Sequence, residues 1–375
     1  MRILVTGGAG FIGRHTVRRL AANGHFVRVL DSLVPEVHEG SGDPVFLPRN
    51  VEFERGDVRD PAALARALNG ISGVLHLAAL TGVGQSMYQW DRYVDANVRG
   101  TATLLQAILE TKAKVKRIVL ASSRAVYGEG AFSCPAHGPV EPQPRHLEQL
   151  ENGRFCPACP CCGTDLQAIP TSESKSPHPA SVYAFTKLQQ EQLVRHFGDA
   201  FGVQVVNLRY FNVYGSEQSL NNPYTGIVSI FFSRIRSGTP IRLYERGLPL
   251  RDFVHVQDVA HANELALVHP LPDSSTLNVG SGIAARIGEV AGYLGAACGQ
   301  DVQLETTPEF RVGDVFACYA DLESARSILG FSPRISLQEG LREFASWAAT
   351  EKSSDRLAQA EAELREMGLQ RVARA

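Results

Sequence analysis

The chain of 375 residues is long enough for two domain-sized units, and its composition of 44% hydrophobic and 20% charged residues is that of a soluble globular protein rather than a fibrous or disordered one. Its 37 lysines and arginines nearly balance 39 aspartates and glutamates, so no overall positive field exists to hold nucleic acid or anionic lipid. No segment approaches the ~20 uninterrupted apolar residues of a membrane span. We therefore expect neither a nucleic-acid partner nor a membrane anchor.

The first residues lead directly into a strand and a glycine turn, without the charged segment and apolar core of a signal peptide, which predicts a cytoplasmic protein. The following residues then alternate short apolar runs with helical patterns, which predicts βαβ units and a parallel sheet. The expected strands are Arg2–Thr6, Val27–Leu30, Val51–Glu54, Gly73–Leu77 and Arg117–Ala121, and the intervening helices include Phe11–Asn23 and Pro61–Leu68.

Regular periodicity stops between Gly128 and Pro179, where Pro, Gly, Cys and His dominate. It resumes with a helix at about Ser181–Phe197 and an apolar run at Val203–Leu208, and the chain after Gly215 becomes mixed and loop-rich. Short elements are expected there around Gly226–Ser237, Ile241–Tyr244 and Val256–Val268. From Glu351 the chain is charged, rich in Ala and free of Pro, which predicts a solvent-facing helix or a frayed tail.

A glycine-rich loop joins the first strand to the first helix. Gly7, Gly10 and Gly13 have the spacing Gly-x2-Gly-x2-Gly, which permits a tight turn, close approach of the backbone to a pyrophosphate, and packing of the helix on the sheet. Asp31 ends the second strand, where a carboxylate can accept hydrogen bonds from ribose hydroxyls and repel a 2′-phosphate. The pattern predicts a dinucleotide site that favours NAD over NADP, with Asp57 and Val58 as adenine contacts.

Tyr183 and Lys187 are four residues apart on a predicted helix and therefore lie on one face. An ammonium beside a phenol lowers the pKa of the phenol, so Tyr183 can act as a base that takes a proton from a sugar hydroxyl while its hydride leaves for NAD. Ser123 is expected to hydrogen-bond the same oxygen.

Together, Thr6–Gly13, Asp57-Val58, Leu77-Ala78-Ala79, Ser122-Ser123 before Val126-Tyr127-Gly128, and Tyr183-x3-Lys187 resemble the extended short-chain dehydrogenase/reductase family. The resemblance implies a Rossmann-type doubly wound α/β sheet with a smaller C-terminal substrate lobe, tightly bound NAD, and a homodimer formed through two helices per subunit. The residues it assigns to NAD are Gly7, Gly10, Phe11, Ile12, Gly13, Asp31, Ser32, Asp57, Val58, Leu77, Ala78, Ala79, Asn97, Tyr183, Lys187, Tyr210 and Val213.

Within the family, three further stretches resemble nucleotide-sugar enzymes: Arg209–Gly215, Arg251–Val256 and Arg311-x2-Asp314. They imply that Asn212 binds the sugar diphosphate and that guanidinium groups pair with it. The expected substrate residues are Thr81, Ser123, Arg124, Asn212, Arg251, Arg311 and Asp314.

The reaction is narrowed by Arg124 and Ala125, which stand where the related dTDP-glucose 4,6-dehydratases have an Asp-Glu pair. The glutamate typical of the nucleotide-sugar decarboxylases is also absent there. Residues 77–86 instead resemble the equivalent loop of UDP-galactose 4-epimerases, and residues 218–226 resemble dTDP-L-rhamnose 4-epimerases. The favoured activity is C4 epimerisation of a dTDP- or UDP-linked hexose or deoxyhexose, with a dehydratase, a 4-ketoreductase or a uronate substrate left open.

The irregular segment contains two units of the form Cys-Pro-x-ligand-Gly, one at Cys134 to Gly138 and one at Cys159 to Gly163. Cys134, His137, Cys159 and Cys162 therefore form a candidate structural zinc site like that of a zinc ribbon. Cys156 with Cys159 is an alternative register, and free or redox-active thiols are the alternative chemistry. Because the segment lies between Ser123 and Tyr183, we expect it to form a lid over the active site.

The expected organisation has five parts: an NAD-binding domain (1–128), a Cys-rich zinc-ribbon-like insertion (129–179), the catalytic helix with the return to the first domain (180–215), a mostly substrate-binding lobe (216–350) and a charged helical tail (351–375). The alternative from another class is an NAD-binding interaction protein that uses the zinc ribbon for a partner. The presence of Ser123, Tyr183 and Lys187 together argues against it.

Overall fold

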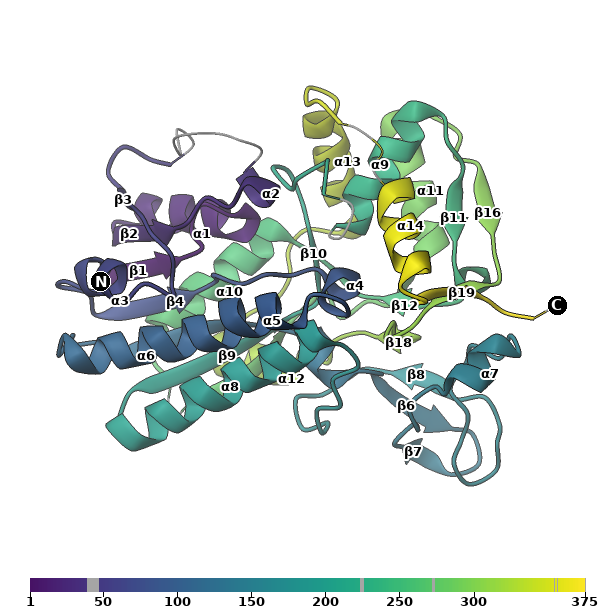
Figure 1. The fold of residues 1–375 in the computed structure, drawn as a ribbon, viewed down its shortest axis with the longest axis horizontal. Helices are drawn as coiled ribbons and strands as arrows, with labels where there is room; N and C mark the ends of the chain where they lie inside the picture. Colours follow the sequence, from purple (N-terminus) through teal and green to yellow (C-terminus); the bar gives the residue numbers. More distant parts are fainter. Residues whose placement is uncertain (39–46, 223–225, 272–273, 354, 356, 375) are drawn as a thin grey trace.

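The computed structural model describes residues 1–38, 47–222, 226–271, 274–353, 355 and 357–374 (Figure 1). A seven-stranded sheet in the order β14-β9-β5-β4-β1-β2-β3 forms its centre, and each of its strand pairings is parallel. Its strands are β1 (Arg2–Thr6), β2 (Phe26–Asp31), β3 (Glu52–Arg55), β4 (Gly73–His76), β5 (Arg117–Ser123), β9 (Gln204–Tyr210) and β14 (Ser275–Val279). The strand order reverses between β1 and β4, which opens a ligand crevice at the carboxyl ends of the strands.

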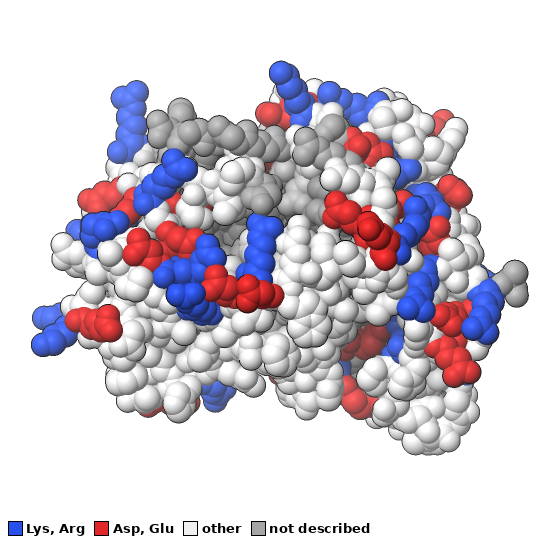
Figure 2. All heavy atoms as spheres, in the orientation of Figure 1, with Lys and Arg blue, Asp and Glu red and all other residues white. Residues whose placement is uncertain are grey.

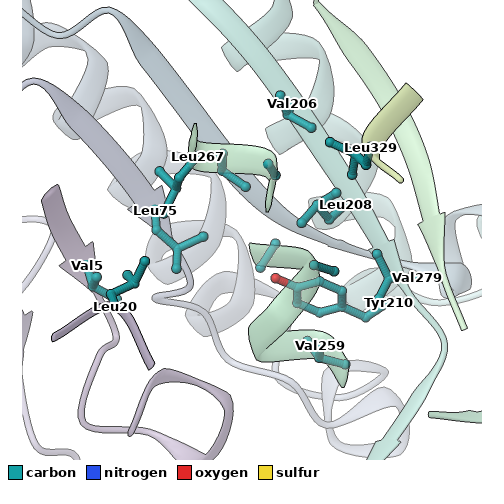
Figure 3. Packing of buried hydrophobic residues seen from close by; sticks show 14 of the residues in the cluster. Val5, Leu20, Leu75, Val206, Leu208, Tyr210, Val259, Leu267, Val279 and Leu329 are labelled. Atoms are coloured by element: carbon teal, nitrogen blue, oxygen red, sulfur yellow. The ribbon is translucent and has the colours of Figure 1, made fainter. Parts of the chain in front are cut away.

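Helices cover both faces of the sheet because residues alternate between the faces along each strand. Ile3 and Val5 of β1 pack with α1, α10 and α12, whereas Leu4 packs with α3, α6 and α8. Figure 3 shows the first of these clusters, with Leu20 from α1 and Val259 from α10 against the strands. The elements of this domain besides its strands are α1 (Phe11–Ala22), α2 (Pro35–His38), α3 (Pro61–Ala67), α4 (Val83–Ser86), α5 (Trp90–Tyr93), the π-helical η1 (Val94–Arg99), α6 (Gly100–Glu110), the 3-10 turn η2 (Arg124–Tyr127), α8 (Val182–Phe201), α10 (Val256–Val268) and α12 (Glu323–Leu329).

The parallel sheet and the doubly wound architecture are therefore confirmed. Sequence reasoning missed β14, which adds an edge strand after β9 from a segment assigned to the second lobe. Three residues of its sequence Ser-Thr-Leu-Asn-Val are polar, so it lacks the apolar run typical of a buried parallel strand. Asn278 is nevertheless fully buried, because its side-chain amide accepts from the Tyr127 hydroxyl and donates to the carbonyls of Thr171 and Asp321.

The C-terminal lobe is built from small sheets and three helices that share an apolar core. Phe232 of α9, Leu294 of α11 and Phe344 of α13 are buried in this core. The elements of the lobe are β10 (Asn212–Tyr214), α9 (Ile227–Ser237), β11 (Ile241–Leu243), η3 (Glu245–Gly247), β12 (Leu250–Arg251), β13 (Phe253–His255), β15 (Ala285–Arg286), α11 (Ile287–Cys298), β16 (Leu304–Thr306), β17 (Glu309–Arg311), β18 (Ala317–Cys318) and α13 (Leu337–Ala348).

The insertion forms its own three-stranded antiparallel sheet, β7-β6-β8, together with one short helix. Its elements are β6 (Ala131–Cys134), β7 (Gly138–Val140), α7 (Leu147–Glu151) and β8 (Gln167–Ile169). Phe155 of the insertion packs against Phe310 of β17, with ring centroids 6.5 Å apart. Figure 1 places this sheet at the far end of the molecule from the N-terminus, beside the C-terminal lobe.

The C-terminal segment, predicted as a solvent-facing helix or a frayed tail, does contain a helix, but the helix is not solvent-facing all round. Residues 357–374 form α14 (Leu357–Glu366) and β19 (Gln370–Val372), and β19 pairs antiparallel with β17. Leu357, Ala360 and Leu364 are buried, so α14 is packed on one face. In the part of the chain that the structure describes, none of the helices has both the length and the apolarity that a membrane crossing requires.

Candidate active site

The glycine loop has the geometry that its three glycines suggested. Gly7 has φ +70°, and a Cβ on it would lie 2.7 Å from the Ala78 nitrogen at the end of β4. A Cβ on Gly13 would lie 2.4 Å from the Gly7 carbonyl oxygen, although Gly13 itself is helical. The first turn of α1 therefore lies against the loop so closely that only glycine fits, and its N-terminus faces the crevice.

Asp31 ends β2 at this crevice and is held by main-chain amides. Its carboxylate accepts hydrogen bonds from the Ala9 nitrogen at 3.0 Å and the Leu33 nitrogen at 2.9 Å, and His38 Nε2 lies 3.4 Å away. The Leu33 and His38 nitrogens both lie at Oδ1, so Oδ2, which accepts from Ala9, is the oxygen that keeps a lone pair for a ribose hydroxyl. His38 was missed by sequence reasoning, and nothing in its short helix marks it as a wall residue.

A cavity of about 540 Å³ opens at the carboxyl ends of the strands. Sixteen of the seventeen residues expected to contact NAD line it. Asn97 is the exception. It is fully buried, and its amide binds the main chain of Leu80 and the Thr186 hydroxyl, so it holds the wall loop 77–81 against α8 rather than facing the cavity.

Ser123, Tyr183 and Lys187 line this same cavity, so the fold brings the end of β5 and one face of α8 together. Ser123 is the N-cap of η2, and its Oγ accepts a hydrogen bond from the Ala125 nitrogen at 3.1 Å. The Lys187 ammonium donates to the Ala121 carbonyl at 2.9 Å. The Tyr183 nitrogen donates to the Ser86 hydroxyl at 3.0 Å, which fixes the first turn of α8.

Burial raises the pKa of Tyr183, and the hydrogen bond with the Ser123 hydroxyl and the positive charge of Arg124 oppose that rise. Burial also lowers the pKa of Lys187 to about 7, opposed by the negative charge of Glu191. The Arg124 guanidinium is therefore a positive charge that acts on the phenol and that sequence reasoning did not assign to this role.

A buried ionic group behind the catalytic residues was also missed. Glu191, one turn beyond Lys187 on α8, receives two hydrogen bonds from Arg209 at 2.8 and 2.9 Å and a short one from the Ser122 hydroxyl. Arg209 also lies over the Tyr127 ring, 4.7 Å from its centroid. The group ties β5, β9 and α8 together next to Ser123. The sequence did contain a signal for Glu191: its spacing from Tyr183 and Lys187 (i, i+4 and i+8) places it on the same face of α8.

A second cavity of about 270 Å³ adjoins the first and contains the other substrate residues. Arg124 and Asn212 line both cavities, whereas Arg251, Arg311 and Asp314 line only the second. The pKa of Asp314 is lowered despite burial, chiefly by Arg251 and Arg311 and further by Arg124 and Arg145. Four guanidinium groups thus surround one carboxylate, and the cavity is electropositive. Residues 218–222 and 226 line or border the first cavity, and 223–225 lie outside the described residues.

These cations differ in how fully the protein already binds them. Arg251 donates to the carbonyls of Leu250, Phe316 and Val315 and to Asp314. Arg311 lies over the Tyr244 ring at 4.7 Å, and its Nε is buried without a partner. Within the described residues, Arg124 makes no hydrogen bond or ion pair, and the Asn212 amide oxygen is likewise buried without a donor. Arg124, Arg311 and Asn212 are therefore the groups available to a ligand.

The insertion brings four candidate metal ligands together. The ligand atoms of Cys134, His137, Cys159 and Cys162 lie within 4.8 Å of one another. Cys134 Sγ lies 3.7 Å from Cys162 Sγ and 3.4 Å from His137 Nδ1, and Cys159 Sγ lies 3.6 Å from the same nitrogen. Cys156 instead lies outside the group, with its Sγ 3.4 Å from the Leu166 carbonyl.

The expectation that the insertion forms a lid over the active site is wrong. The described residues that line the two cavities include none from 129–179. The insertion instead supports the second cavity from behind through Arg145, whose buried guanidinium binds Glu129, Glu245 and the Asp314 carbonyl at 2.6–2.8 Å. Arg145 and Glu245 are 100 residues apart, so sequence spacing gave no signal of this contact.

The fold and the cavity define a dinucleotide-dependent enzyme with a Ser-Tyr-Lys set. Residues 3–149 and 155–280 match the model of the NAD dependent epimerase/dehydratase family. The chain is 38% identical over 353 residues to a dTDP-L-rhamnose 4-epimerase of Burkholderia thailandensis, which covers 93% of this chain and 95% of the relative.

Two solved structures are also similar over almost their whole length. The UDP-glucose 4-epimerase of Thermotoga maritima with UDP-glucose has a TM-score of 0.76 at 29% identity, covering 93% of this chain and 99% of that one. That of Thermus thermophilus with NAD has a TM-score of 0.75 at 30% identity, covering 94% and 100%. The chain belongs to the NAD-dependent epimerase/dehydratase family, as its motifs suggested.

Proposed function

We propose that this NAD-dependent nucleotide-sugar 4-epimerase inverts C4 of a hexose or deoxyhexose carried on dTDP or UDP. The observation that carries the proposal is the shared wall of two cavities. Ser123, Tyr183 and Lys187 line the first, and Arg124 and Asn212 connect it to the arginine cluster of the second. A nucleotide sugar has the matching layout, with a reactive sugar beside Tyr183 and a diphosphate beside the arginines.

Bound NAD would supply the acceptor and donor of the C4 hydride. The Tyr183 phenolate takes the proton of the C4 hydroxyl and gives it back after the 4-keto sugar has rotated. The Ser123 hydrogen bond and the Arg124 charge favour the phenolate, because both lower the pKa that burial raises. Lys187 lies one turn along α8 and supplies a second proton-carrying group on the same wall.

The positions of the carboxylates in the wall of the first cavity favour epimerisation over dehydration. Loss of water across C5 and C6 needs an acid and a base beside the sugar, and Arg124 and Ala125 occupy the positions next to Ser123. Among the described wall residues, Asp31, Asp57 and Glu217 carry carboxylates. Asp31 ends β2 and Asp57 follows β3, and both strands are separated from β5, which carries Ser123, by β1 and β4. Glu217 pairs with Arg14 and Arg18.

The diphosphate is bound by Arg124 and Arg311, with Asn212 beside them. Two charge-assisted contacts offset the desolvation of these guanidinium groups. Among the described residues neither group forms an ion pair with a carboxylate, so both keep donors for a ligand. Arg251 contributes positive charge while its own donors stay on the protein.

The test is to incubate the protein, without added NAD, with dTDP- and UDP-sugars in D2O and follow the sugar protons by NMR. Inversion at C4 without deuterium uptake is expected, because the hydride returns within the enzyme. Deuterium at C5 with loss of water would identify a dehydratase instead. Absence of turnover on the whole panel would contradict the proposal.

We also propose that Cys134, His137, Cys159 and Cys162 hold a structural zinc ion. Tetrahedral zinc with bonds of about 2.3 Å to sulfur and 2.0 Å to nitrogen places two sulfurs about 3.8 Å apart and sulfur from nitrogen about 3.5 Å. The Sγ–Sγ distance of 3.7 Å and the Sγ–Nδ1 distances of 3.4 and 3.6 Å match this geometry. Four protein ligands fill the coordination shell, so the ion is structural.

Elemental analysis and thermal melting test the metal site. We expect about one zinc per chain and a lower melting temperature in Cys162→Ser and after chelation. Cys161→Ser is the matched control, because Cys161 is the exposed neighbour outside the ligand group. A protein that contains no metal and whose melting temperature is unchanged by chelators would support a thiol cluster instead.

We further propose a homodimer through α5, α6 and α8. Exposed apolar side chains gather on these helices: Trp90 is 63%, Phe185 50% and Phe201 55% exposed. Figure 2 shows a broad area without charged side chains where α6 and α8 lie. Phe185→Glu should yield a monomer in sedimentation analysis, whereas Ile283→Glu, at another exposed apolar residue, should leave the dimer intact. A wild-type monomer at micromolar concentration would contradict this interface.

A further inference from the structure

The C-terminal segment crosses the molecule at the outer end of the second cavity. We call residues 357–373, which form α14 and β19, the C-terminal strap. β19 pairs with β17 in the register Arg311↔Gln370, so the strap is joined to the strand that carries Arg311. In Figure 1, α14 lies between α4 of the nucleotide-binding domain and the helices of the C-terminal lobe.

On the lobe side the strap is held by a buried carboxylate. Glu361 of α14 is 5% exposed, lies 3.5 Å from Arg242 and receives a short hydrogen bond from the Tyr244 hydroxyl. Tyr244 is the residue whose ring lies under Arg311. The same helix therefore fixes the aromatic surface on which one of the proposed diphosphate ligands is positioned.

On the other side the strap contacts the nucleotide-binding domain. The Tyr88 hydroxyl donates to Glu363 at 2.9 Å, and a Cβ on Gly84 of α4 would lie 3.3 Å from Leu364. The strap thus contacts both units beside the second cavity.

Three strap leucines, Leu357, Leu364 and Leu369, line the second cavity. In the proposed function the sugar lies beside Ser123 and Tyr183 in the first cavity. The diphosphate then lies by Arg124, which lines both cavities, and Arg311, which lines the second. The part of a nucleotide sugar that extends farther into the second cavity is the nucleoside. The base of the nucleoside is flat and weakly polar, so it packs favourably on leucine side chains.

On the basis of the proposed function, we propose that the C-terminal strap forms a wall of the nucleoside site and closes over the pyrimidine nucleoside of the substrate. Leu364 packs on the nucleoside, and the contact of Tyr88 with Glu363 keeps the strap closed while the sugar reacts. The strap acts on nucleotide affinity and leaves NAD binding unchanged, because its leucines lie outside the first cavity.

The probes are dTDP and UDP, titrated calorimetrically into the full-length protein with its NAD content measured. Leu364→Ala should raise Kd about tenfold, since it removes most of one buried leucine side chain from the site. Tyr88→Phe keeps the ring and removes the hydrogen bond, so it should raise Kd about threefold. Met367→Ala is the control, because Met367 is 55% exposed and lies outside the cavity wall.

The two probes differ by the thymine methyl and the ribose 2′-hydroxyl, so a larger loss for dTDP would place Leu364 against the base. Unchanged Kd values for both probes in Leu364→Ala and Tyr88→Phe would overturn the strap proposal even if the wild type epimerises sugars. Loss of NAD in either variant would also overturn it. A wild-type protein that binds neither probe would refute the proposed function, and the strap proposal with it.

Discussion

Arg124 and Arg145 are two arginines near the second cavity whose removal should have opposite consequences. Arg145 is 3% exposed and binds two carboxylates and two carbonyls. Its replacement by Met leaves Glu129 and Glu245 without their cation. Breaking a buried pair in this way costs about 3–5 kcal/mol. The lower value applies, because Glu129 keeps the main-chain donors of Phe316 and Ala317 and burial has already raised the pKa of Glu245 to about 7.

Arg124 has no such partner within the described part of the chain, and burial lowers its pKa, with the charge of Arg251 acting in the same direction. Arg124→Met should therefore leave the free energy of unfolding of the unliganded protein unchanged or slightly higher. It should weaken dTDP and UDP binding by about 10- to 150-fold, because a charge-assisted hydrogen bond contributes roughly 1.5–3 kcal/mol.

We would compare the two variants by thermal melting for stability and by calorimetric titration for dTDP and UDP affinity. Arg326→Met, at an exposed arginine, controls for the lost charge. Equal destabilisation by Arg124→Met and Arg145→Met would refute the reasoning. So would unchanged dTDP and UDP affinity in Arg124→Met. If only the affinity for a UDP-uronate fell, Arg124 would bind the carboxylate of the sugar instead.

Three further predictions test the catalytic and NAD sites. Tyr183→Phe should lower turnover by at least about 10²-fold with NAD content unchanged, and near-normal turnover would remove Tyr183 as the base. Because Lys187 titrates near pH 7 when folded and far higher when unfolded, the unfolded chain binds more protons between these values, and stability rises with pH there. Chemical denaturation should show this rise from pH 7 to 10 in the wild type relative to Lys187→Met; parallel curves would contradict it. Gly13→Ala should abolish NAD retention because its Cβ meets the Gly7 carbonyl, whereas Gly292→Ala, which meets nothing within 4 Å in α11, should stabilise by about 0.5–1 kcal/mol. NAD retained in Gly13→Ala would contradict the steric argument.

Local sequence patterns were sufficient to predict much of the candidate site. Gly7 and Gly13 are required by contacts within one βα unit, and the Cys-Pro-x-ligand-Gly spacing brought the metal ligands together. The strap was missed although its signal was present. Leu357, Ala360, Glu361 and Leu364 follow i, i+3, i+4 and i+7, the stripe of a helix with one buried face, and the surrounding charges obscured it.

The placement of the insertion depended on contacts that no spacing reveals. Its position between Ser123 and Tyr183 in the chain suggested proximity to the active site, but chain order does not determine the direction in which an inserted sheet leaves its entry point. Phe155 packing on Phe310 and Arg145 binding Glu245 decided that direction. Both contacts join residues at least 100 positions apart.

The division of the substrate space into two connected cavities separates recognition from chemistry. If the nucleoside diphosphate end anchors the molecule, the sugar can turn over inside the larger space while remaining tethered, and the reactive ketone does not diffuse away. The wall that contacts the sugar and the wall that contacts the nucleoside diphosphate can then evolve independently. In the proposed function, substitution of a first-cavity residue such as Thr81 would change which sugars are accepted. Arg311 and the strap would still bind the same nucleoside diphosphate, so new sugars could be accepted without loss of nucleotide affinity.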